Sequence, residues 1–453
     1  MLNSELQNHL KKIGVVPNKV LGQNFLLHEE TSRWIVDQLD ITREDVVVEV
    51  GPGMGALTEH LAGKPRRLIL LEKDTRLAGW LRKHYAKQGF AVEVIEGDAA
   101  QYDFRPLFLE GPVKLIGNLP YSGATEIMMH FLRAPTPVHR AVLMLQREVA
   151  ERICAEPGTK AYGVLSLILQ RLWLPEMLRV VDGTIFHPRP EVDSAIIRLN
   201  PRPPETLAPH SPDLVEDLVR KGFAQRRKQL HNNLTADKTR WEETCSAMGL
   251  PLAVRGEALS LEQWIALANH LDTHPCARST GTNPAELFDV VDEHDHVIGQ
   301  EQRSLVHAQK LRHRAVHVFL FNREGDLYLQ CRSPLKDSHP LKWDSSSSGH
   351  LDAGESYEDA AVRELGEELL VRLKDPLELI GSLPAGPGTD QEFVKLFRGH
   401  WNGLVRVHTS EILHGGFFPP PLVREWIESR PQDFARGFIE CFNCFQRRTP
   451  DRE

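Results

Sequence analysis

Apolar and polar positions follow two different patterns along residues 34–200. Short apolar runs are separated by amphipathic stretches of helical length, which is typical of buried parallel strands joined by helices. The expected strands are Val46–Val50, Leu68–Leu71, Val92–Ile95, Lys114–Ile116 and Ala141–Leu145. This alternation predicts an α/β fold built on a doubly wound sheet.

The pattern changes after residue 200, where Pro201-Arg-Pro-Pro204 interrupts it. Residues 212–272 show helical periodicity only, which predicts a small all-α subdomain. The next residues are small and polar and contain Pro and Gly, as in a linker. Strand-like runs then return in FDVVDE, AVHVFLF and DLYLQCR, before a helix at 355–371. The expected boundaries are 1–200 for the first domain, 201–272 for the helical subdomain, 273–285 for the linker and 286–453 for the last domain.

Composition narrows the class of protein. With 453 residues, of which 41% are hydrophobic and 26% charged, the chain resembles an ordinary globular protein rather than a disordered or fibrous one. No apolar stretch approaches the ~18 residues of a membrane span, and the first residues do not resemble a signal peptide. Six cysteines are too sparse for a disulfide scaffold, so we expect a reduced, cytoplasmic protein without a membrane partner. The pair Cys441 and Cys444 lacks the further ligands of a zinc site. We expect these two thiols to take part in helix packing rather than in metal binding.

The charge is distributed unevenly. The net charge of −8 argues against a nucleic-acid partner, but residues 1–278 hold 34 Lys+Arg and 34 Asp+Glu, whereas residues 279–453 hold 20 and 28. The acidity therefore belongs to the second part alone. Local clusters in the first part, Lys11, Lys12 and Lys19 and then Arg226-Arg227-Lys228, are candidates for phosphate contacts or for solvated helix faces.

A glycine-rich turn follows the first buried strand in Glu49-Val-Gly51-Pro-Gly53-Met-Gly55. Glycines here allow the backbone to approach a ligand at a helix N-terminus. Glu72, at the end of the next strand, is placed to accept hydrogen bonds from ribose hydroxyls, and Asp98 ends the third strand at the same edge. Three consecutive strand ends thus predict one ligand cavity.

The fourth strand ends in Asn118-Leu-Pro120-Tyr121. The exocyclic amine of adenine is a poor nucleophile because its lone pair is delocalised into the ring. A side-chain amide oxygen and a backbone carbonyl that accept its two N–H bonds would favour a pyramidal nitrogen aimed at a methyl sulfonium. Tyr121 offers a face on which an extruded base can stack, so catalysis would rest on positioning and electrostatics rather than on a strong base.

Residues ~10–272 resemble the small-subunit rRNA adenine N6,N6-dimethyltransferase family (the KsgA type). The matching blocks, besides GPGMGALT and NLPY, are Asn18–Leu26, LQREVAERI, PGTKAYGVLS, Phe186–Ser194 and FAQRRKQLHNNL. The resemblance implies a Rossmann-like class I S-adenosylmethionine-dependent methyltransferase sheet with a small helical subdomain.

The resemblance also implies roles for single residues. Asn118, Pro120 and Tyr121 would hold the target adenine, with Phe186 as a second stacking ring or, alternatively, as a core aromatic residue. The implied S-adenosylmethionine contacts are Asn24, Leu26, Gly51, Gly53, Glu72, Asp98 and Asn118. The implied substrate is a pair of adjacent adenines in the 3′-terminal hairpin of small-subunit (16S) rRNA, with the 30S subunit as partner. Methylation of large-subunit (23S) rRNA is the alternative, although Leu119 and the Phe186–Ser194 block favour the small subunit.

The second part contains Gly349-x5-Glu355-x7-Arg363-Glu364-Leu-x-Glu367-Glu368. Glu364, Glu367 and Glu368 fall on one helix face, where carboxylates repel unless a divalent cation binds. Oxygen ligands suit Mg²⁺ or Mn²⁺, which would neutralise a diphosphate and activate water.

This spacing resembles the Nudix signature, here over residues 349–371, and implies an α/β/α Nudix hydrolase domain. Glu364, Glu367 and Glu368 would be the metal ligands, and Glu355 would pair with Arg363 to brace the preceding loop. Leu370 stands near the end of the box, where the family usually has Gly, so the helix is expected to end differently. A non-catalytic module that docks on the ribosome is the alternative to a hydrolase.

Residues ~286–450 also resemble the branch of the Nudix family close to isopentenyl-diphosphate isomerase. The positions near that enzyme's metal site are occupied here by His307, His313, His350, Asp390 and Glu392. These residues either form a second metal site or the histidines are structural. Glu392 is also a candidate base. Ser348 occupies the position of the isomerase's catalytic cysteine, so we expect hydrolysis of a diphosphate rather than isomerisation.

Overall fold

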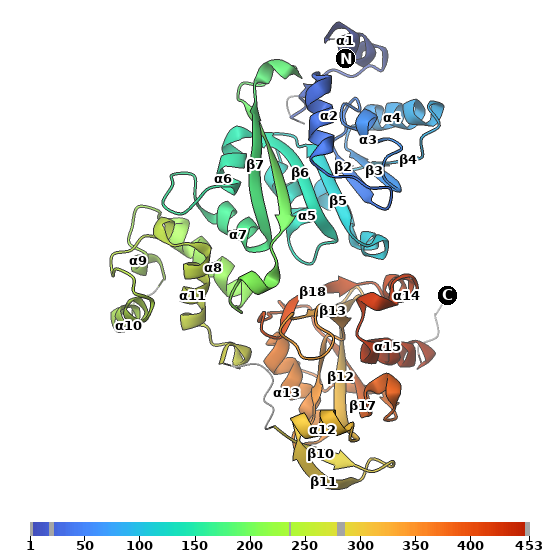
Figure 1. The fold of residues 1–453 in the computed structure, drawn as a ribbon, viewed down its shortest axis with the longest axis vertical. Coiled ribbons are helices and arrows are strands. Elements are labelled where there is room, and N and C mark those ends of the chain that lie inside the picture. The colour runs from blue at the N-terminus through green and yellow to red at the C-terminus, as the bar shows by residue number, and fades with distance from the viewer. Residues whose placement is uncertain (1–2, 18–21, 235–236, 279–285, 449–453) are drawn as a thin grey trace. The chain divides into compact units, whose positions relative to one another are not determined.

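The protein is described by a computed structural model that covers residues 3–17, 22–234, 237–278 and 286–448 (Figure 1). Contacts between residues divide it into two units. The first contains residues 1–203, 223–229 and 255–261, and the second contains residues 204–222, 230–254 and 262–453.

The first unit is built on a seven-stranded sheet with the order β4-β3-β2-β5-β6-β9-β7. Its strands are β2 (Val46–Val50), β3 (Arg67–Glu72), β4 (Val92–Glu96), β5 (Val113–Asn118), β6 (Val138–Gln146), β7 (Trp173–Val181) and β9 (Ser194–Pro201). The five strands from β4 to β6 run parallel, which confirms the expected segments. The antiparallel strands β9 and β7 were not among them. The paired β1 (Phe25–Leu26) and β8 (Phe186–His187) lie outside this sheet.

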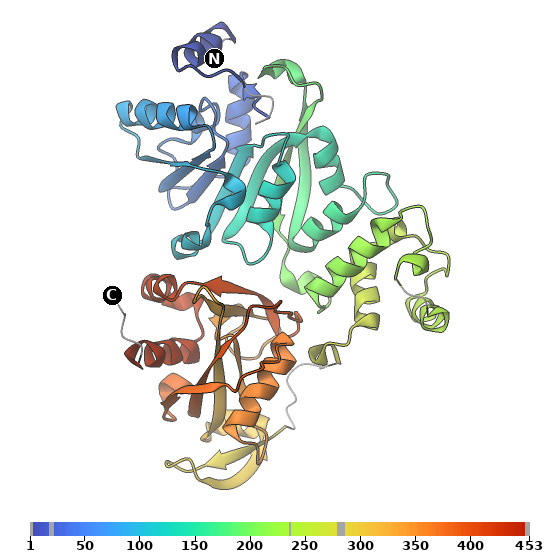
Figure 2. The same ribbon diagram turned by 180° about the vertical axis from the view of Figure 1, so that it is seen from behind.

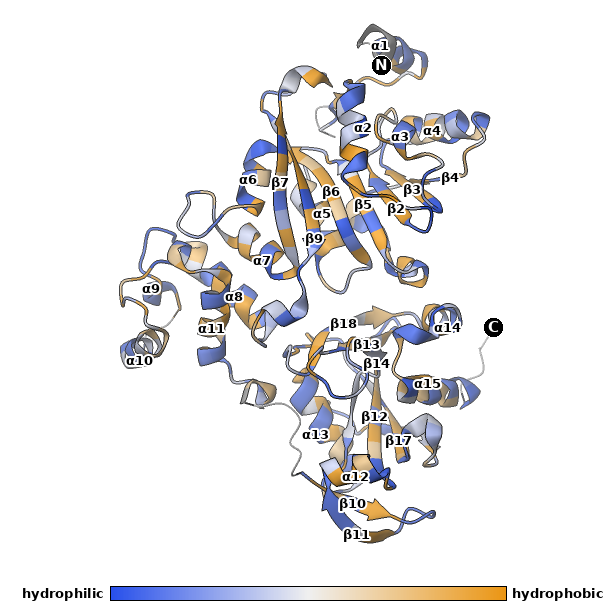
Figure 3. Ribbon diagram, viewed as in Figure 1, coloured by the Kyte–Doolittle hydropathy of each residue, from blue (hydrophilic) through white to orange (hydrophobic). Residues whose placement is uncertain are grey.

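Helices cover both faces of this sheet, as Figures 1 and 2 show from opposite sides. Alternate residues of one strand point to different cores: Val47 packs in the cluster of α2 (Glu29–Asp37), α3 (Thr58–Leu61) and α4 (Thr75–Lys87). Val46 and Val48 pack in the cluster of α5 (Ala124–Leu132), α6 (Arg147–Ile153) and α7 (Val164–Leu172). The hydrophobic strands between these layers stand out in Figure 3.

The segment expected to be all-helical contains α8 (Pro212–Ala224), α9 (His231–Leu234), α10 (Lys238–Met248) and α11 (Leu261–Leu271). In its core, a Cβ on Gly222 would lie 2.4 Å from the Trp264 ring, so α8 and α11 approach closely. Of the expected linker, residues 275–278 form a short 3-10 helix, η6 (Pro275–Arg278), and Cys276 is buried.

The second unit contains another seven-stranded sheet, in which β12 (His313–Phe321) and β17 (Glu392–His400) run parallel. The other strands are β13 (Leu327–Arg332), β14 (Trp343–Asp344), β15 (Ser347–His350), β16 (Glu378–Leu383) and β18 (Ile412–Phe418). A separate hairpin, β10 (Leu287–Val291) and β11 (Val297–Gln302), leads into α12 (Arg303–Gln309).

This second sheet also lies between helices. Val316, Val318 and Leu320 of β12 pack in one cluster with α13 (Tyr357–Leu369). The intervening Phe319 contacts the rings of Phe438, Phe442 and Phe445 on α15 (Arg436–Arg448), which follows α14 (Pro420–Ser429). The α/β/α layering is thus confirmed, and Cys441 and Cys444 are buried thiols of α15, as expected.

Candidate active sites

A cavity opens at the carboxyl ends of β2, β3 and β5 in the first unit. It is lined by all seven predicted cofactor residues and by three of the four predicted adenine-binding residues, with Asn118 in both sets: Asn24, Leu26, Gly51, Gly53, Glu72, Asp98, Asn118, Pro120 and Tyr121. Parallel strands present their carboxyl ends at one edge of a sheet, so residues from separate motifs meet there.

The glycine turn is held against Glu72. Gly51 and Gly53 have positive φ angles of 64° and 57°, a conformation that glycine adopts without strain. The Gly53 N–H donates to Glu72 Oε2 at 3.0 Å, and the Asp74 N–H donates to Oε1 at 2.9 Å. Burial raises the pKa of Glu72, while these N–H groups lower it. Each carboxylate oxygen keeps a further lone pair for the hydroxyls of a ribose.

Asp98 begins the short helix η1 (Ala99–Gln101) and accepts the Ala100 N–H at 3.0 Å. Its other oxygen accepts from Lys73 Nζ at 2.6 Å, and this lysine holds the pKa of Asp98 below its usual range. Lys73 also lines the cavity but was not among the predicted residues. Its position directly after Glu72, at a strand end, was the available signal.

Asn118 is oriented by its neighbours. Its Nδ2 donates to the backbone oxygen of Asn24 at 2.9 Å, which leaves Oδ1 as the free acceptor of the side-chain amide. Tyr121 lies at the mouth of the same cavity, and its hydroxyl is 2.8 Å from Ser194 Oγ. The two residues can therefore present an acceptor and an aromatic face to one base.

Phe186 does not join this group. Its ring is 3% exposed and packs in the core cluster with Leu26 and Met144, and it is not part of the cavity lining. The residue pairs with Leu26 in the β1–β8 bridge. In this conformation Phe186 is a core aromatic residue. Its ring would have to move before it could stack on a base.

The residues of the expected basic clusters differ in whether their charges are available for phosphates. Arg226 is not available for phosphates, because its three guanidinium nitrogens donate to Glu257 at 2.7 Å, to Lys160 O at 2.7 Å and to Thr159 O at 2.9 Å. The prediction for Arg226 is therefore wrong, because all three guanidinium nitrogens make hydrogen bonds inside the unit and the side chain acts as a structural brace. Arg227, Lys228, Lys11 and Lys12 are exposed. Lys19 lies outside the described residues.

The second unit has its own cavity, into which the carboxylates of α13 face. Glu364, Glu367 and Glu368 all line it. Burial and the neighbouring carboxylates raise the pKa of Glu364 well above its usual range, and burial raises that of Glu368. Acids that are disfavoured as anions in this way would be stabilised by a divalent cation, so the donor set fits Mg²⁺ or Mn²⁺.

The predicted brace is present. Arg363 donates to both oxygens of Glu355, at 2.9 and 2.8 Å, to Glu364 at 2.8 Å and to His350 O at 3.0 Å. Gly349 is required beside it, because a Cβ there would lie 2.0 Å from Glu364 Oε1.

The end of α13 differs from the usual box in residue type but not in shape. Leu370 takes the left-handed conformation, with φ of 52°, that glycine normally supplies after a helix. Leucine at this position therefore still allows the left-handed helix ending that a glycine would give.

The predicted histidines come together, and one of them, His350, lines the cavity. His307, His313 and His350 each offer a ligand nitrogen, and these atoms lie within 4.8 Å of one another. Glu392 Oε1 lies 2.9 Å from His350 Nε2 and 3.5 Å from His313 Nε2. These histidines hold the pKa of Glu392 well below its usual range, although burial opposes them. Asp390 lines the cavity but is not part of the histidine group.

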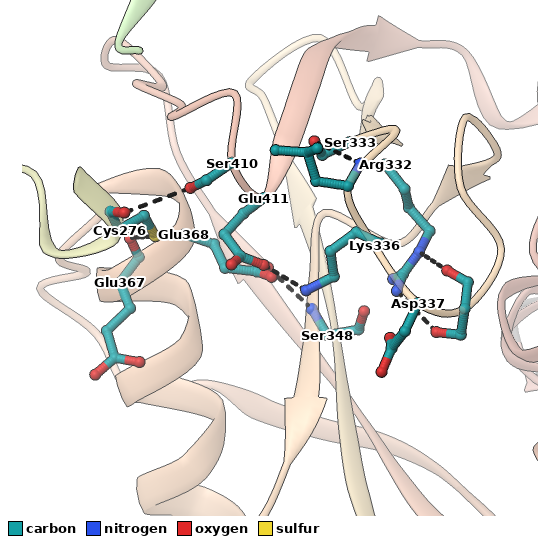
Figure 4. Close-up of polar contacts among 12 residues, drawn as sticks. Cys276, Arg332, Ser333, Lys336, Asp337, Ser348, Glu367, Glu368, Ser410 and Glu411 are labelled. Carbon is teal, nitrogen blue, oxygen red and sulfur yellow. Dashed lines mark hydrogen bonds and ion pairs between the residues drawn. The ribbon is translucent and has the colours of Figure 1, made fainter. Parts of the chain in front are cut away.

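A further wall of this cavity was not predicted. It carries Arg303, Arg332, Lys336 and Glu411. Lys336 Nζ contacts the Glu411 carboxylate (Figure 4). Arg332 donates to Asp344 at 2.9 Å. These residues come from three separate segments, around residues 303, 332–336 and 411, without a recognisable spacing, so only the fold reveals that they meet.

The chain thus has one cavity at the ends of parallel strands with a glycine-rich turn and a separate cavity lined by carboxylates. Residues 16–273 match the family model of ribosomal RNA adenine dimethylase, and residues 311–436 match that of the NUDIX domain. The chain therefore belongs to the ribosomal RNA adenine dimethylase family and carries a Nudix domain after that match.

Relatives of the first part include the ribosomal RNA small subunit methyltransferase A of Bacillus cereus (strain B4264), which is 39% identical over 277 residues, 58% of this chain and 94% of that protein. The Bacillus anthracis (strain CDC 684 / NRRL 3495) protein of the same name is 38% identical with the same coverage.

Among solved structures, the 23S rRNA methyltransferase ErmE is 28% identical, covers 55% of this chain and 100% of its own, and has a TM-score of 0.47. DR0079 from Deinococcus radiodurans is 27% identical over 35% of this chain and 99% of its own, with a TM-score of 0.32. None of the described helices combines the length and the apolar character that crossing a membrane requires.

Proposed function

We propose that the first part of the chain dimethylates two adjacent adenines at N6 in the 3′-terminal hairpin of 16S rRNA, with S-adenosylmethionine as methyl donor. The observation that carries this proposal is that Asn118, Pro120 and Tyr121 line the same cavity as the glycine turn and Glu72. The names of the Bacillus relatives favour the small subunit as substrate. Such a substrate places the protein with ribosomes in the cytoplasm.

In this mechanism, Glu72 would bind the ribose of the donor and Asp98 its adenine, and Asn24, Leu26, Gly51 and Gly53 would complete the contacts. Asn118 Oδ1 and the Pro120 carbonyl accept the two N–H bonds of the target amine, and Tyr121 stacks on the base. The bound donor supplies an electrophilic methyl group. The residues orient the amine lone pair toward it, and no residue has to remove a proton before attack.

Isolated ribosomal subunits test this proposal. Methyl incorporation into 30S RNA, and its loss in Asn118→Ala, is the expected result. Incorporation confined to 50S RNA would instead establish the alternative, a 23S rRNA methyltransferase. An Asn118→Ala protein that lacks methylation but still supports ribosome assembly would make an assembly checkpoint the main role.

We further propose that the Nudix domain hydrolyses a diphosphate-containing small molecule, such as a nucleoside diphosphate derivative. Glu364, Glu367 and Glu368 would hold Mg²⁺ or Mn²⁺, which supplies charge neutralisation and an activated water. Arg363 fixes the carboxylates and the loop before them, and Ser347 Oγ donates to Glu368 at 2.9 Å. The observation that carries this proposal is the convergence of the three acids in one cavity.

The three histidines favour a second divalent ion, with Glu392 as a fourth ligand. Metal analysis of the purified chain would test this, since His313→Ala should lose one bound ion while Glu367→Gln loses the other. Isomerase activity is not part of the proposal, because the hydroxyl of Ser348 is a poor replacement for a thiol in proton transfer.

Phosphate release from a panel of nucleotides and other diphosphates, dependent on Mg²⁺ and lost in Glu367→Gln, separates a hydrolase from a docking module. No turnover on any substrate would favour the module.

A further inference from the structure

Residues outside the Nudix match form part of the wall of its cavity. Pro275 and Cys276 line it, although the match begins at residue 311. The Cys276 thiol is buried and donates to the backbone oxygen of Glu367 at 3.3 Å (Figure 4). The short helix η6 thus holds the last turn of α13, from which two of the three proposed metal ligands project.

A second contact holds the loop His408–Glu411, which lies before β18. The Thr409 N–H donates to His210 O at 2.8 Å, and the His210 N–H donates to Thr409 Oγ1 at 2.8 Å. Ser410 Oγ donates to Cys276 O at 3.4 Å. The loop is therefore bound by a residue of the helical subdomain and by the segment that follows that subdomain.

The same loop is bound to the Nudix sheet on its other side. The Ser333 N–H donates to Glu411 O at 2.9 Å, and Ser333 Oγ donates to Thr409 O at 2.7 Å. The Glu411 carboxylate contacts Lys336 inside the cavity. Glu411 and Glu368 line the same cavity. A displacement of the loop would therefore change the charge beside a proposed metal ligand.

Residues 272–276 are packed rather than extended as a free tether. His274 and Cys276 are buried, and the rings of His274 and His408 lie 5.7 Å apart. Asp272 accepts hydrogen bonds from the Ser211 hydroxyl and from the His274 N–H. Fixed contacts of this kind transmit displacement, whereas a flexible linker would absorb it.

We propose that His210 and residues 272–276, here called the joint, position the hydrolase site. The joint fixes the end of α13 and the loop His408–Glu411, so the metal site is complete only when the joint is in place. The inference rests on the proposed metal-dependent function of the Nudix domain. It follows that a movement of the helical subdomain reaches the metal ligands, and that residues 286–453 alone form an incomplete site.

Mn²⁺ binding to the full chain, measured by electron paramagnetic resonance, tests the joint without any substrate. Cys276→Ala removes the thiol donor and Thr409→Val removes the acceptor for His210, while both keep similar volumes. We expect each to weaken Mn²⁺ binding about threefold to tenfold, and Cys276→Ser to restore it, because a hydroxyl donates to the same carbonyl. Hydrogen exchange at Glu411 and Ile412 should rise in the first two variants.

Cys245→Ala is the matched control, since Cys245 is a buried thiol of α10 that contacts Pro251 O instead. Wild-type Mn²⁺ affinity and exchange in Cys276→Ala and Thr409→Val would overturn the proposed joint. A wild-type chain that binds no Mn²⁺, or whose binding survives Glu367→Gln, would instead overturn the metal site itself. S-adenosylmethionine binding, measured by calorimetry, should stay unchanged in every variant and shows that the first unit is folded, while restored Mn²⁺ binding in Cys276→Ser shows the same for the second unit.

Discussion

Gly349 and Glu364 approach so closely that no side chain fits between them: a Cβ on Gly349 would lie 2.0 Å from Glu364 Oε1. The glycine has no positive φ angle, so backbone freedom does not explain it. The residue is therefore glycine because the carboxylate needs the space.

Gly349→Ala should consequently displace Glu364 and weaken Mn²⁺ binding by at least about tenfold, since even small displacements disturb metal geometry. Titration calorimetry with Mn²⁺ measures this. Gly366→Ala in α13 is the control, because a Cβ there meets no atom within 4 Å. Equal Mn²⁺ affinity in the two variants would show that the close approach has no functional meaning.

Asn118→Asp should lower the rate of methyl transfer to 30S subunits by about 100-fold or more. A carboxylate cannot donate to Asn24 O, so it is repelled by that carbonyl and loses the orientation that the amide has. Single-turnover incorporation of labelled methyl groups measures the rate. Donor affinity, measured separately by calorimetry, should change by less than about tenfold, and an unchanged rate would remove Asn118 from the proposed mechanism.

Glu72→Gln should weaken S-adenosylmethionine binding about tenfold. The amide keeps one acceptor oxygen where the carboxylate offers two, so it cannot serve Gly53, Asp74 and a ribose together. Calorimetric titration provides the readout. Glu93→Gln is the control, because Glu93 lies on the adjacent strand β4 and pairs with Arg67 near the surface. A similar loss of affinity in both variants would contradict a specific role for Glu72.

Glu49 makes stability depend on pH. Burial raises its pKa from 4.5 to about 8, so between these values the folded chain keeps a proton that the unfolded chain releases. The stability this provides is complete below pH 4.5 and is lost as the pH rises toward 8. The free energy of unfolding should therefore fall by about 1–3 kcal/mol more in the wild type than in Glu49→Gln. Urea denaturation of both proteins at each end of this pH range measures the difference. Parallel dependence of the free energy of unfolding on pH in the two proteins would contradict the raised pKa of Glu49.

The features that could be predicted are those that depend on short-range patterns in the sequence. Parallel strands such as Val46–Val50 reveal themselves as apolar runs, and the strand-end motifs with Glu72 and Asn118 meet because all parallel strands end at one edge. The antiparallel β7 was not foreseen, because Pro175 and the charged residues Glu176 and Arg179 make it resemble an exposed segment.

Long-range pairing was not predictable in the same way. Arg226 belongs to a basic run that resembles an exposed phosphate contact, and only the fold brings Glu257 to it. The Glu411–Lys336 pair joins residues 75 positions apart, and no spacing in the sequence indicates it. Residues 273–278 are polar and small like a linker, yet Cys276 is buried because the Nudix domain supplies its surroundings.

The central claim is that one chain carries a methyltransferase and a separate active site for metal-dependent hydrolysis. The most direct measurement compares the wild type with Glu367→Gln on a panel of diphosphates in Mg²⁺, with methyl incorporation into 30S subunits recorded for the same preparations. We predict phosphate release by the wild type, its loss in Glu367→Gln, and equal 30S methylation by both. Absence of release from every diphosphate, or release that Glu367→Gln retains, would contradict the account.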